Sequence, residues 1–262
     1  MLEVKVRSPL RYHGGKSRMV DRIIPMIPPH VCYCEPFVGA GWILFSKKPA
    51  KVEVINDSDG ELVTFWRVIQ NHLEEFLRFY KNAIISRKIF DLEKLKNPAT
   101  LTDIQRAVRY YYLQRLSFGG LTVNRSFGTG ATVASGLFLS TMGDTLLNVH
   151  WRLQAVVIEN LDGCECIRRY DRPGTFFYID PPYFGVSGYT VDFKPCDYIR
   201  LHAALTGLKG KFILSLNDVP EIRKLFKGFI QKRVITTYSA ANGRSDSDTR
   251  VKPRHELLIR NF

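Results

Sequence analysis

The chain has 262 residues, of which 38 are lysine or arginine and 25 are aspartate or glutamate, so its formal net charge is +13. Hydrophobic residues make up 45% and charged residues 24% of the chain, which are ordinary values for a globular protein and argue against disorder. No apolar run approaches the roughly 20 residues of a membrane-spanning helix, and residues 1–10 lack the apolar core of a secretory signal. We therefore expect a cytoplasmic protein that does not associate with membranes.

The positive charge is concentrated in two segments of the chain. Residues 67–125 contain 11 basic and 5 acidic residues, and residues 222–262 contain 10 basic and 3 acidic residues, whereas the remainder is neutral. Such an excess favours a polyanionic partner, but charge alone does not identify one. Five cysteines in a chain of this length do not indicate a disulfide framework.

The first half of the chain begins with an α/β pattern. The apolar run at 31–34 leads into a Glu-Pro-Phe-Val-Gly-Ala-Gly segment at 35–41 and then a short helical stretch, which is how a nucleotide-binding α/β unit opens. Several β-branched residues predict a second strand over 51–55. Apolar residues at helical spacing then predict a helix over 61–80 and another over 104–111.

The second half of the chain continues the alternation of strands and helices. The Gly/Ser/Thr-rich segment 117–136 has no periodicity and is predicted to form a long loop. Strand-like runs resume at three positions, 155–158, 176–179 and 212–216. Two final runs, at 233–238 and 256–259, are expected to close the sheet as an antiparallel pair. The order indicates an open, mostly parallel α/β sheet with a basic helical subdomain inserted near its middle.

The most specific chemical feature is the tetrapeptide Asp180-Pro181-Pro182-Tyr183, which follows the strand predicted over 176–179. Ligands of open α/β sheets bind beyond the carboxyl ends of the strands. The prolines lack N–H donors, so the Asp180 carboxylate and the Pro181 carbonyl can both accept hydrogen bonds from one amino group. The Tyr183 ring can stack on a flat heterocycle. These groups suit the exocyclic amine of a base, and the alternative is a Pro-Pro turn that only closes a strand.

Two other positions favour a nucleoside cofactor. Gly39 and Gly41 allow the backbone to approach a ligand closely, but the third glycine of a dinucleotide fingerprint is replaced by Leu44. A dinucleotide-dependent oxidoreductase is therefore disfavoured. Asp57 follows the strand predicted over 51–55, where an acid can bind ribose hydroxyls. Its surroundings also fit an exposed turn.

Four motifs occur in order along the chain: Tyr12-His13-Gly14-Gly15-Lys16, the segment 35–41, Asn56-Asp57 and Asp180-Pro181-Pro182-Tyr183. Together they resemble the Dam-type (D12 class) DNA adenine-N6 methyltransferase family, and the resemblance covers almost the whole chain. It implies a Rossmann-like S-adenosylmethionine-dependent methyltransferase sheet with an antiparallel terminal strand pair. The catalytic domain would comprise residues 1–64 and 151–262, and an inserted helical, DNA-binding target-recognition subdomain would comprise residues 65–150.

The resemblance also implies which residues bind S-adenosylmethionine. Asp57 would hold the ribose hydroxyls, Asp180 would touch the methionine end while also facing the substrate, and Asp162 would contact the adenine of the cofactor. The full set of implied cofactor-binding residues is Tyr12, Lys16, Phe37, Gly39, Gly41, Asp57, Asp162 and Asp180. No metal is implied, because a sulfonium is already a good leaving group and positioning with electrostatics suffices.

The implied activity is site-specific methyl transfer to N6 of an adenine that is flipped out of duplex DNA. Asp180 and the Pro181 carbonyl would accept the two N–H bonds of the amine, and Tyr183 would stack on the base. The implied catalytic residues are therefore Asp180, Pro181, Pro182 and Tyr183. An RNA adenine methyltransferase, a DNA cytosine-N4 methyltransferase and a catalytically silent DNA-binding relative are the alternatives.

The expected partner is double-stranded DNA, and a cognate restriction endonuclease could be a second one, with a monomer or a weak dimer as the expected state. Arg115, Asn124 and Arg125 are candidates for reading base edges, whereas basic side chains that only face water are the alternative. Further candidates for DNA contact, in the polar loop before the last strand, are Arg244, Arg250 and Lys252.

Two local features refine the expected DNA interface. Asn124 to Gly128 form a segment that is shorter than in Dam relatives and lacks their proline, so a GATC target is not implied. Tyr110, Tyr111 and Tyr112 cannot all lie on one face of a helix. At least one of the three is therefore expected to be exposed or to contact DNA.

Overall fold

The computed structural model describes residues 6–12, 14–128, 139–237 and 253–262. In these ranges the chain forms a seven-stranded sheet with the order β3-β2-β1-β4-β5-β7-β6. Strands β1 to β5 are parallel to their neighbours, and β7 is antiparallel to both β5 and β6. The predicted open sheet with a closing antiparallel pair is confirmed. The strands are β1 (Cys32–Glu35), β2 (Val52–Asn56), β3 (Val156–Glu159), β4 (Thr175–Ile179), β5 (Lys211–Asn217), β6 (Ile230–Thr237) and β7 (Pro253–Arg260).

Both faces of the sheet are covered by helices. On one face Tyr33 and Phe176 pack with α1, α2 and α3, and on the other Cys34 and Phe177 pack with α8, α9 and α10. This double coverage explains why β4 is buried along its whole length, since parallel strands covered on both faces consist of nearly continuous apolar runs. The helices on these faces are α1 (Val20–Ile23), α2 (Trp42–Ser46), α3 (Gly60–Asn71), α8 (Gly163–Tyr170), α9 (Pro195–Leu205) and α10 (Pro220–Leu225).

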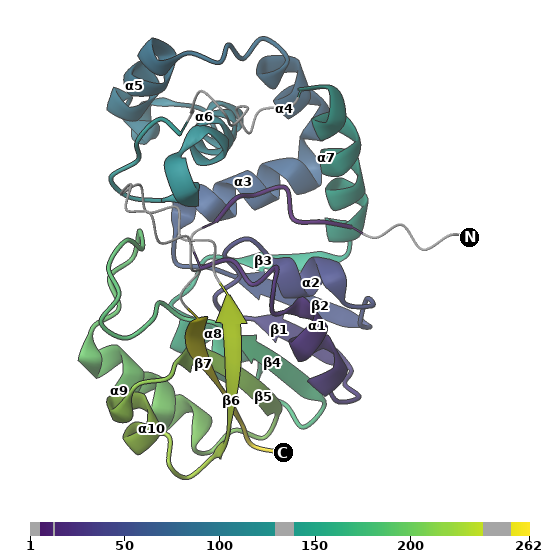
Figure 1. The fold of residues 1–262 in the computed structure, drawn as a ribbon. Coiled ribbons are helices and arrows are strands. Elements are labelled where there is room, and N and C mark those ends of the chain that lie inside the picture. The colour runs from purple at the N-terminus through teal and green to yellow at the C-terminus, as the bar shows by residue number, and fades with distance from the viewer. Residues whose placement is uncertain (1–5, 13, 129–138, 238–252) are drawn as a thin grey trace.

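A group of helices between β2 and β3 lies above the sheet in Figure 1. It is built from α3 and from α4 (Leu73–Tyr80), α5 (Arg87–Leu95), α6 (Asp103–Leu116) and α7 (Leu139–Leu153). The helix predicted over 61–80 is two helices, because the backbone leaves the helical region at His72, with φ −136° and ψ 38°. The helical spacing of apolar residues continues from α3 into α4, so periodicity alone does not reveal the break between them.

The prediction for the three consecutive tyrosines was wrong. Tyr110, Tyr111 and Tyr112 are 2%, 1% and 4% exposed. Helix α6 packs against α3, α4 and α5 at the same time, so every side of its central turn is covered. The Tyr112 hydroxyl donates a hydrogen bond to the Ile84 carbonyl at 2.8 Å, which satisfies its polar end.

The loop predicted over 117–136 is described as far as residue 128. It contains a short 3-10 turn, Phe118–Gly120, and Ser117 pairs with Phe127 in an isolated antiparallel bridge. Residues 129–136 lie outside the described part of the chain. Among the helices that the structure describes, none has the length and apolar character needed to cross a membrane.

Candidate active site

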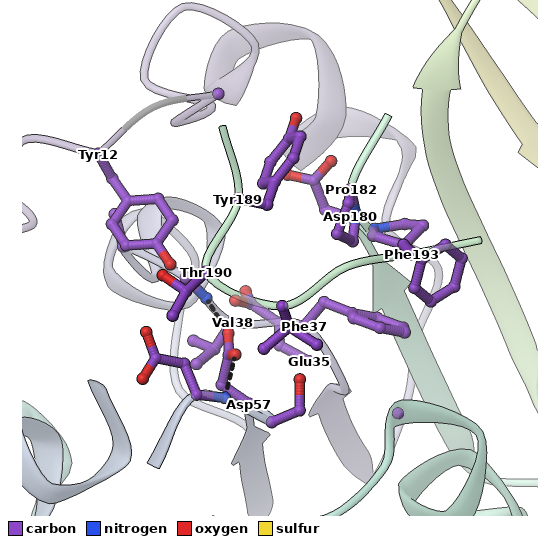
Figure 2. Close-up of a pocket in the computed structure, with 18 of the residues that line it drawn as sticks. Tyr12, Glu35, Phe37, Val38, Asp57, Asp180, Pro182, Tyr189, Thr190 and Phe193 are labelled. Carbon is purple, nitrogen blue, oxygen red and sulfur yellow. Dashed lines mark hydrogen bonds between the residues drawn. The ribbon is translucent and has the colours of Figure 1, made fainter. Parts of the chain in front are cut away.

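A cavity of about 380 Å³ opens beyond the carboxyl ends of β1, β2 and β4 (Figure 2). Because β1 lies between β2 and β4, this is the point where the strand order changes direction, and ligands of open α/β sheets bind there. The cavity volume is in the range of small-molecule sites. Residues predicted from the sequence to bind the cofactor all line it: Tyr12, Lys16, Phe37, Gly39, Gly41, Asp57, Asp162 and Asp180.

The turn after β1 forms one wall of the cavity. Gly39 and Gly41 have φ values of 47° and 66°, a left-handed conformation that residues with a Cβ rarely adopt. Asp57 accepts hydrogen bonds from the backbone N–H groups of Gly39 and Asp59, both at 3.0 Å. The Tyr12 ring lies so close to the turn that a Cβ on Gly39 would meet it at 3.3 Å. At these glycines the cavity wall therefore consists of backbone, which the Asp57 carboxylate holds at the end of β2.

Burial raises the pKa of Asp57 to about 6, and the backbone N–H groups that it binds oppose this rise. The carboxylate remains ionised at neutral pH, although it is removed from water. Each of its oxygens can accept a further hydrogen bond. Asp57 therefore offers acceptors to hydroxyl groups of a ligand in the cavity (Figure 2).

Phe37 and Phe193 form an aromatic wall of the cavity, with ring centres 5.8 Å apart in an edge-to-face arrangement. Phe37 packs directly on Gly163, where a Cβ would come within 2.2 Å of the ring. Next to it, the Asp162 Oδ1 atom accepts hydrogen bonds from Cys164 N–H at 3.1 Å and Glu165 N–H at 3.2 Å, which caps α8. Asp162 thus combines a helix-capping contact with its place in the cavity.

Lys16 and Asp180 connect the first and the last motif of the chain. The Lys16 ammonium lies 2.7 Å from the Asp180 carboxylate and 4.6 Å from the centre of the Tyr183 ring, and it donates to the Gly14 carbonyl at 3.0 Å. Burial raises the pKa of Asp180 to about 6, and the positive charge of Lys16 opposes this rise. The site therefore holds a cation between a carboxylate and an aromatic face.

The acceptor tetrapeptide follows β4 and is held by side chains from other elements. Pro181 and Pro182 line the cavity together with Asp180. The Tyr198 hydroxyl on α9 donates to the Pro182 carbonyl at 2.7 Å, and the Tyr183 hydroxyl lies 3.4 Å from the Ser215 hydroxyl on β5. Because prolines lack an N–H group, Pro181 and Pro182 offer only carbonyl acceptors.

The two arginines predicted to read base edges are both engaged in contacts within the protein. Arg115 donates to the Pro9 carbonyl at 3.2 Å. Arg125 donates to the Gln114 side chain at 3.1 Å, and its guanidinium lies 5.4 Å from the centre of the Tyr110 ring. The first contact joins α6 to the N-terminal segment, and the second joins the loop after α6 to the buried side of that helix. The structure thus places both arginines between elements.

The other predicted DNA contacts are placed differently. Asn124 is exposed and has a φ of 48°, a conformation that asparagine tolerates better than most residues. Its position at a tight turn leaves the side chain in water. Arg244, Arg250 and Lys252 lie outside the described residues.

Several cavity residues were missed by the sequence reasoning. Tyr189, Thr190 and Phe193 line the cavity from the segment after the acceptor tetrapeptide, which has no periodicity and no motif, so only tertiary folding brings them there. Glu35 also lines the cavity, and its place inside the motif at 35–41 was a usable signal. Tyr33 donates a hydrogen bond to Glu35, and burial raises the pKa of Glu35 to about 8.

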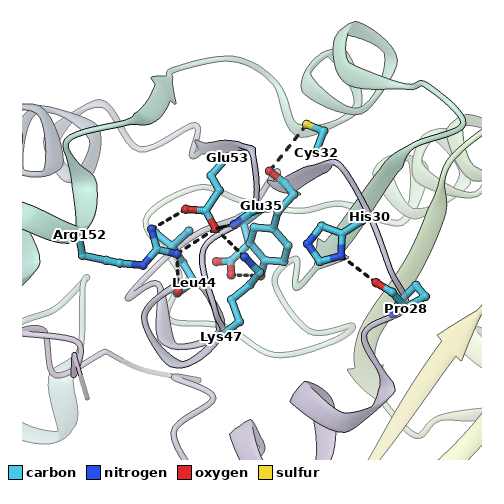
Figure 3. Close-up of polar contacts among 10 residues, drawn as sticks. Pro28, His30, Cys32, Glu35, Leu44, Lys47, Glu53 and Arg152 are labelled. Atoms are coloured by element: carbon cyan, nitrogen blue, oxygen red, sulfur yellow. Dashed lines mark hydrogen bonds and ion pairs between the residues drawn. The ribbon is translucent and has the colours of Figure 1, made fainter. Parts of the chain in front are cut away.

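A buried polar network connects β2, α2 and α7 (Figure 3). The Lys47 ammonium lies 2.5 Å from the Glu53 carboxylate, and Arg152 pairs with the same carboxylate. Arg152 also donates to the Leu44 carbonyl of α2 at 3.0 Å. Buried charges persist when they are paired and hydrogen-bonded in this way. The network fixes the end of α7 to the helix that follows the glycine turn.

Comparison with known proteins adds independent information. A sequence model of the family described as D12 class N6 adenine-specific DNA methyltransferase matches residues 12–240. The chain is 25% identical over 286 residues to the type II methyltransferase M1.LlaDCHI of Lactococcus lactis subsp. cremoris, which covers 99% of this chain and 97% of that protein. It is 27% identical over 296 residues to the type II methyltransferase M.MjaIII of Methanocaldococcus jannaschii, which covers 99% and 100%. It is also 23% identical over 121 residues to the DNA adenine methylase of Escherichia coli K12, which covers 45% and 43%.

Proposed function

Since this chain belongs to the D12 class N6 adenine-specific DNA methyltransferase family, we propose that its cavity binds S-adenosylmethionine beside an adenine flipped out of duplex DNA. When bound, the cofactor supplies a methyl group attached to a positively charged sulfur. The observation that carries the proposal is the contact of Lys16 with Asp180 and Tyr183. A nitrogen with N–H donors is already held there, between a carboxylate and an aromatic face.

The cavity suits the cofactor chemically. The positive φ values of Gly39 and Gly41 open space that a Cβ would fill, and Phe37 with Phe193 offers aromatic faces to an adenine ring. Asp57 would accept hydrogen bonds from the ribose hydroxyls. Carboxylates around the cavity favour a ligand with a positive charge, and they include Asp57, Asp59 and Asp180.

The adenine amine would donate its two hydrogens to the Asp180 carboxylate and the Pro181 carbonyl. Both acceptors follow β4 directly, and neither proline offers a competing N–H. Two such bonds leave the nitrogen lone pair pointing away from the acceptors, toward the rest of the cavity. When the nitrogen gains a methyl group it must release one proton. Asp180, ionised above a pKa of about 6, can accept that proton.

Lys16 has two roles in this proposal. Its ammonium lies 2.7 Å from the Asp180 carboxylate, and this positive charge favours the ionised form of the buried carboxylate. The carboxylate of the cofactor would give Lys16 a second partner, so that Asp180 can accept the amine of the base. Tyr12, which covers the glycine turn, would contact the cofactor on the same side.

Residues 65–150 would form the target-recognition subdomain. Exposed lysines and arginines on this part of the chain would neutralise DNA phosphates, and they include Arg67, Arg78, Lys81, Arg87, Lys88, Lys94 and Lys96. Asn124, which is exposed, would contact bases, and Arg244, Arg250 and Lys252 would contact the DNA backbone. We also propose a cognate restriction endonuclease as partner, because two relatives of full length are named type II methyltransferases.

The proposal is tested with isotopically labelled S-adenosylmethionine and duplex DNA of mixed sequence, followed by mapping of the labelled bases. We expect the label on N6 of adenine, at positions that share a sequence. Single-stranded RNA and a DNA duplex without adenine serve as controls. Label on cytosine, label on RNA alone, or binding of DNA without any transfer would each contradict the proposal.

A further inference from the structure

Asn217, the last residue of β5, holds the residue that follows the acceptor tetrapeptide. Its side-chain amide donates to the Phe184 carbonyl at 2.9 Å and accepts from the Phe184 N–H at 3.0 Å. One side chain thus satisfies both backbone groups of Phe184, as a neighbouring strand would. The contact fixes the backbone immediately after Tyr183.

Ser215 supports the same motif from the same strand. Ser215 and Asn217 are two residues apart, so their side chains point to the same face of β5. The Ser215 hydroxyl lies 3.4 Å from the Tyr183 hydroxyl and donates to the Glu256 carboxylate at 3.2 Å. Ser215 and Glu256 are 0% and 1% exposed. The ring and the backbone of the Tyr183–Phe184 pair are therefore both anchored to β5.

The chain beyond Phe184 returns one hydrogen bond to the motif, from the Val186 N–H to the Tyr183 carbonyl at 3.1 Å. Gly185 and Gly188 follow at φ values of 69° and 109°, and a backbone with such glycines has wide conformational freedom. On the other side, the Tyr198 hydroxyl bonds the Pro182 carbonyl at 2.7 Å. Without Asn217, Tyr183 and Pro182 would keep their contacts with Ser215 and Tyr198. The backbone of Phe184 would lose both of its hydrogen bonds to β5.

We propose that Asn217 is a positioning residue for methyl transfer, in an inference that rests on the function proposed above. By fixing Phe184, it keeps the Tyr183 ring and the Pro181 carbonyl in constant geometry relative to Asp180. A reacting group displaced by about 1 Å can lose roughly 100-fold in rate. Asn217 itself does not line the cavity. Its loss should therefore lower kcat and leave the affinity for cofactor unchanged.

The chain contains a matched control. Asn261 accepts from the Phe212 N–H at 3.0 Å and donates to the Gly210 carbonyl at 3.0 Å. Like Asn217, Asn261 accepts one backbone hydrogen bond and donates another, but it does so at the opposite end of β5, away from the cavity. Removing either amide costs hydrogen bonds of the same kind, and only Asn217 is connected to the acceptor tetrapeptide.

The experiment compares Asn217→Ala with Asn261→Ala in the full chain, by kcat, KM for DNA, cofactor affinity and melting temperature. We expect similar losses in melting temperature, and a fall in kcat of about 10- to 100-fold in Asn217→Ala alone. In both variants, the KM for DNA and the cofactor affinity should stay within about threefold of the wild-type values. A kcat near wild type in Asn217→Ala, or equal losses in both variants, would overturn the inference.

A second variant keeps the test decisive if Asn217→Ala does not fold. Asn217→Asp has the same shape and still accepts from the Phe184 N–H, but it places a carboxylate oxygen against the Phe184 carbonyl. Its kcat should fall with cofactor affinity unchanged, and a kcat near wild type would contradict the inference. Absence of adenine methylation by the wild-type protein would instead contradict the proposed function. The wild-type measurement therefore distinguishes that failure from a failure of the inference about Asn217.

Discussion

The Lys16 ammonium lies 2.7 Å from the Asp180 carboxylate, and the two side chains are only 4% and 17% exposed. This ion pair joins the N-terminal motif to the tetrapeptide after β4, at the edge of the cavity. A buried carboxylate without a partner would keep its proton, whereas the nearby ammonium favours its ionised form. The pair therefore sets the charge of the group on which the proposed chemistry depends.

The first prediction concerns the pH dependence of turnover. Asp180 must be ionised to accept the amine, and burial raises its pKa to about 6 while Lys16 opposes the rise. At saturating DNA and cofactor, kcat should fall as the pH is lowered through about 6, by roughly tenfold for each further pH unit. Lys16→Gln removes the opposing charge, so its acidic limb should move to higher pH. Lys48→Gln, an exposed lysine, is the control. An unchanged midpoint in Lys16→Gln would count against this role.

The second prediction concerns stability and Glu35. Its folded-state pKa is raised to about 8 by burial, from an ordinary value of 4.5. Between these values the folded protein keeps a proton that the unfolded chain has released. The free energy of unfolding should therefore decrease as the pH rises through this window, by up to about 1.4 kcal/mol per pH unit from this group.

Glu35→Gln tests this effect because glutamine resembles the protonated acid and does not titrate. Denaturant unfolding from pH 5 to pH 8 should show a flatter pH dependence in the variant than in the wild-type protein. The stability difference in favour of the variant should grow as the pH rises. Parallel curves for the two proteins would show that Glu35 is not the group responsible.

The third prediction uses two glycines. A Cβ at Gly163 would come within 2.2 Å of the Phe37 ring, so Gly163→Ala must displace that ring. Aromatic contacts contribute about 0.5–1.5 kcal/mol, and cofactor affinity should weaken by about three- to tenfold. A Cβ at Gly143 in α7 would meet no atom within 4 Å, so Gly143→Ala should leave affinity unchanged and raise stability by about 0.5–1 kcal/mol. Cofactor affinity is measured by calorimetric titration of both variants. Equal affinities in Gly163→Ala and Gly143→Ala would contradict the role of Phe37 in cofactor binding.

The fourth prediction separates DNA backbone contacts from base contacts. Replacing Arg244, Arg250 and Lys252 by glutamine should weaken binding to all duplexes alike and reduce the salt dependence by roughly one unit of slope for each contact. Asn124→Ala should instead change the preference among sequences. Binding measured over a salt series on several duplexes distinguishes the two. A changed preference in the triple variant would contradict its assigned role.

Much of the fold could be predicted from the sequence. The predicted bounds of β1, β2, β4 and β5 lie within about two residues of the observed ones. These strands are easy to find because parallel strands covered on both faces are nearly continuous apolar runs. The break at His72 and the burial of all three tyrosines at 110–112 could not be predicted. Both depend on which helices pack around a segment, and local periodicity does not contain that information.

The candidate site was predictable where motifs carry it and unpredictable elsewhere. Residues of the four motifs line one cavity, since the carboxyl ends of adjacent parallel strands meet at one edge. For Arg115 and Arg125, residue type suggests contacts with bases, but it does not tell whether a guanidinium faces DNA or its own chain. Asn217 had no local signal, because its importance arises from a contact with Phe184 that only the folded sheet creates.

The most direct test of the proposed mechanism is methyl transfer by Asp180→Ala, measured together with cofactor affinity. Asp171→Ala is the control, because the Asp171 carboxylate binds the backbone N–H groups of Lys209 and Gly210 and does not line the cavity. We expect Asp180→Ala to lose adenine methylation while its cofactor affinity weakens only in part, and Asp171→Ala to keep both. Near-normal turnover by Asp180→Ala would contradict the proposed mechanism.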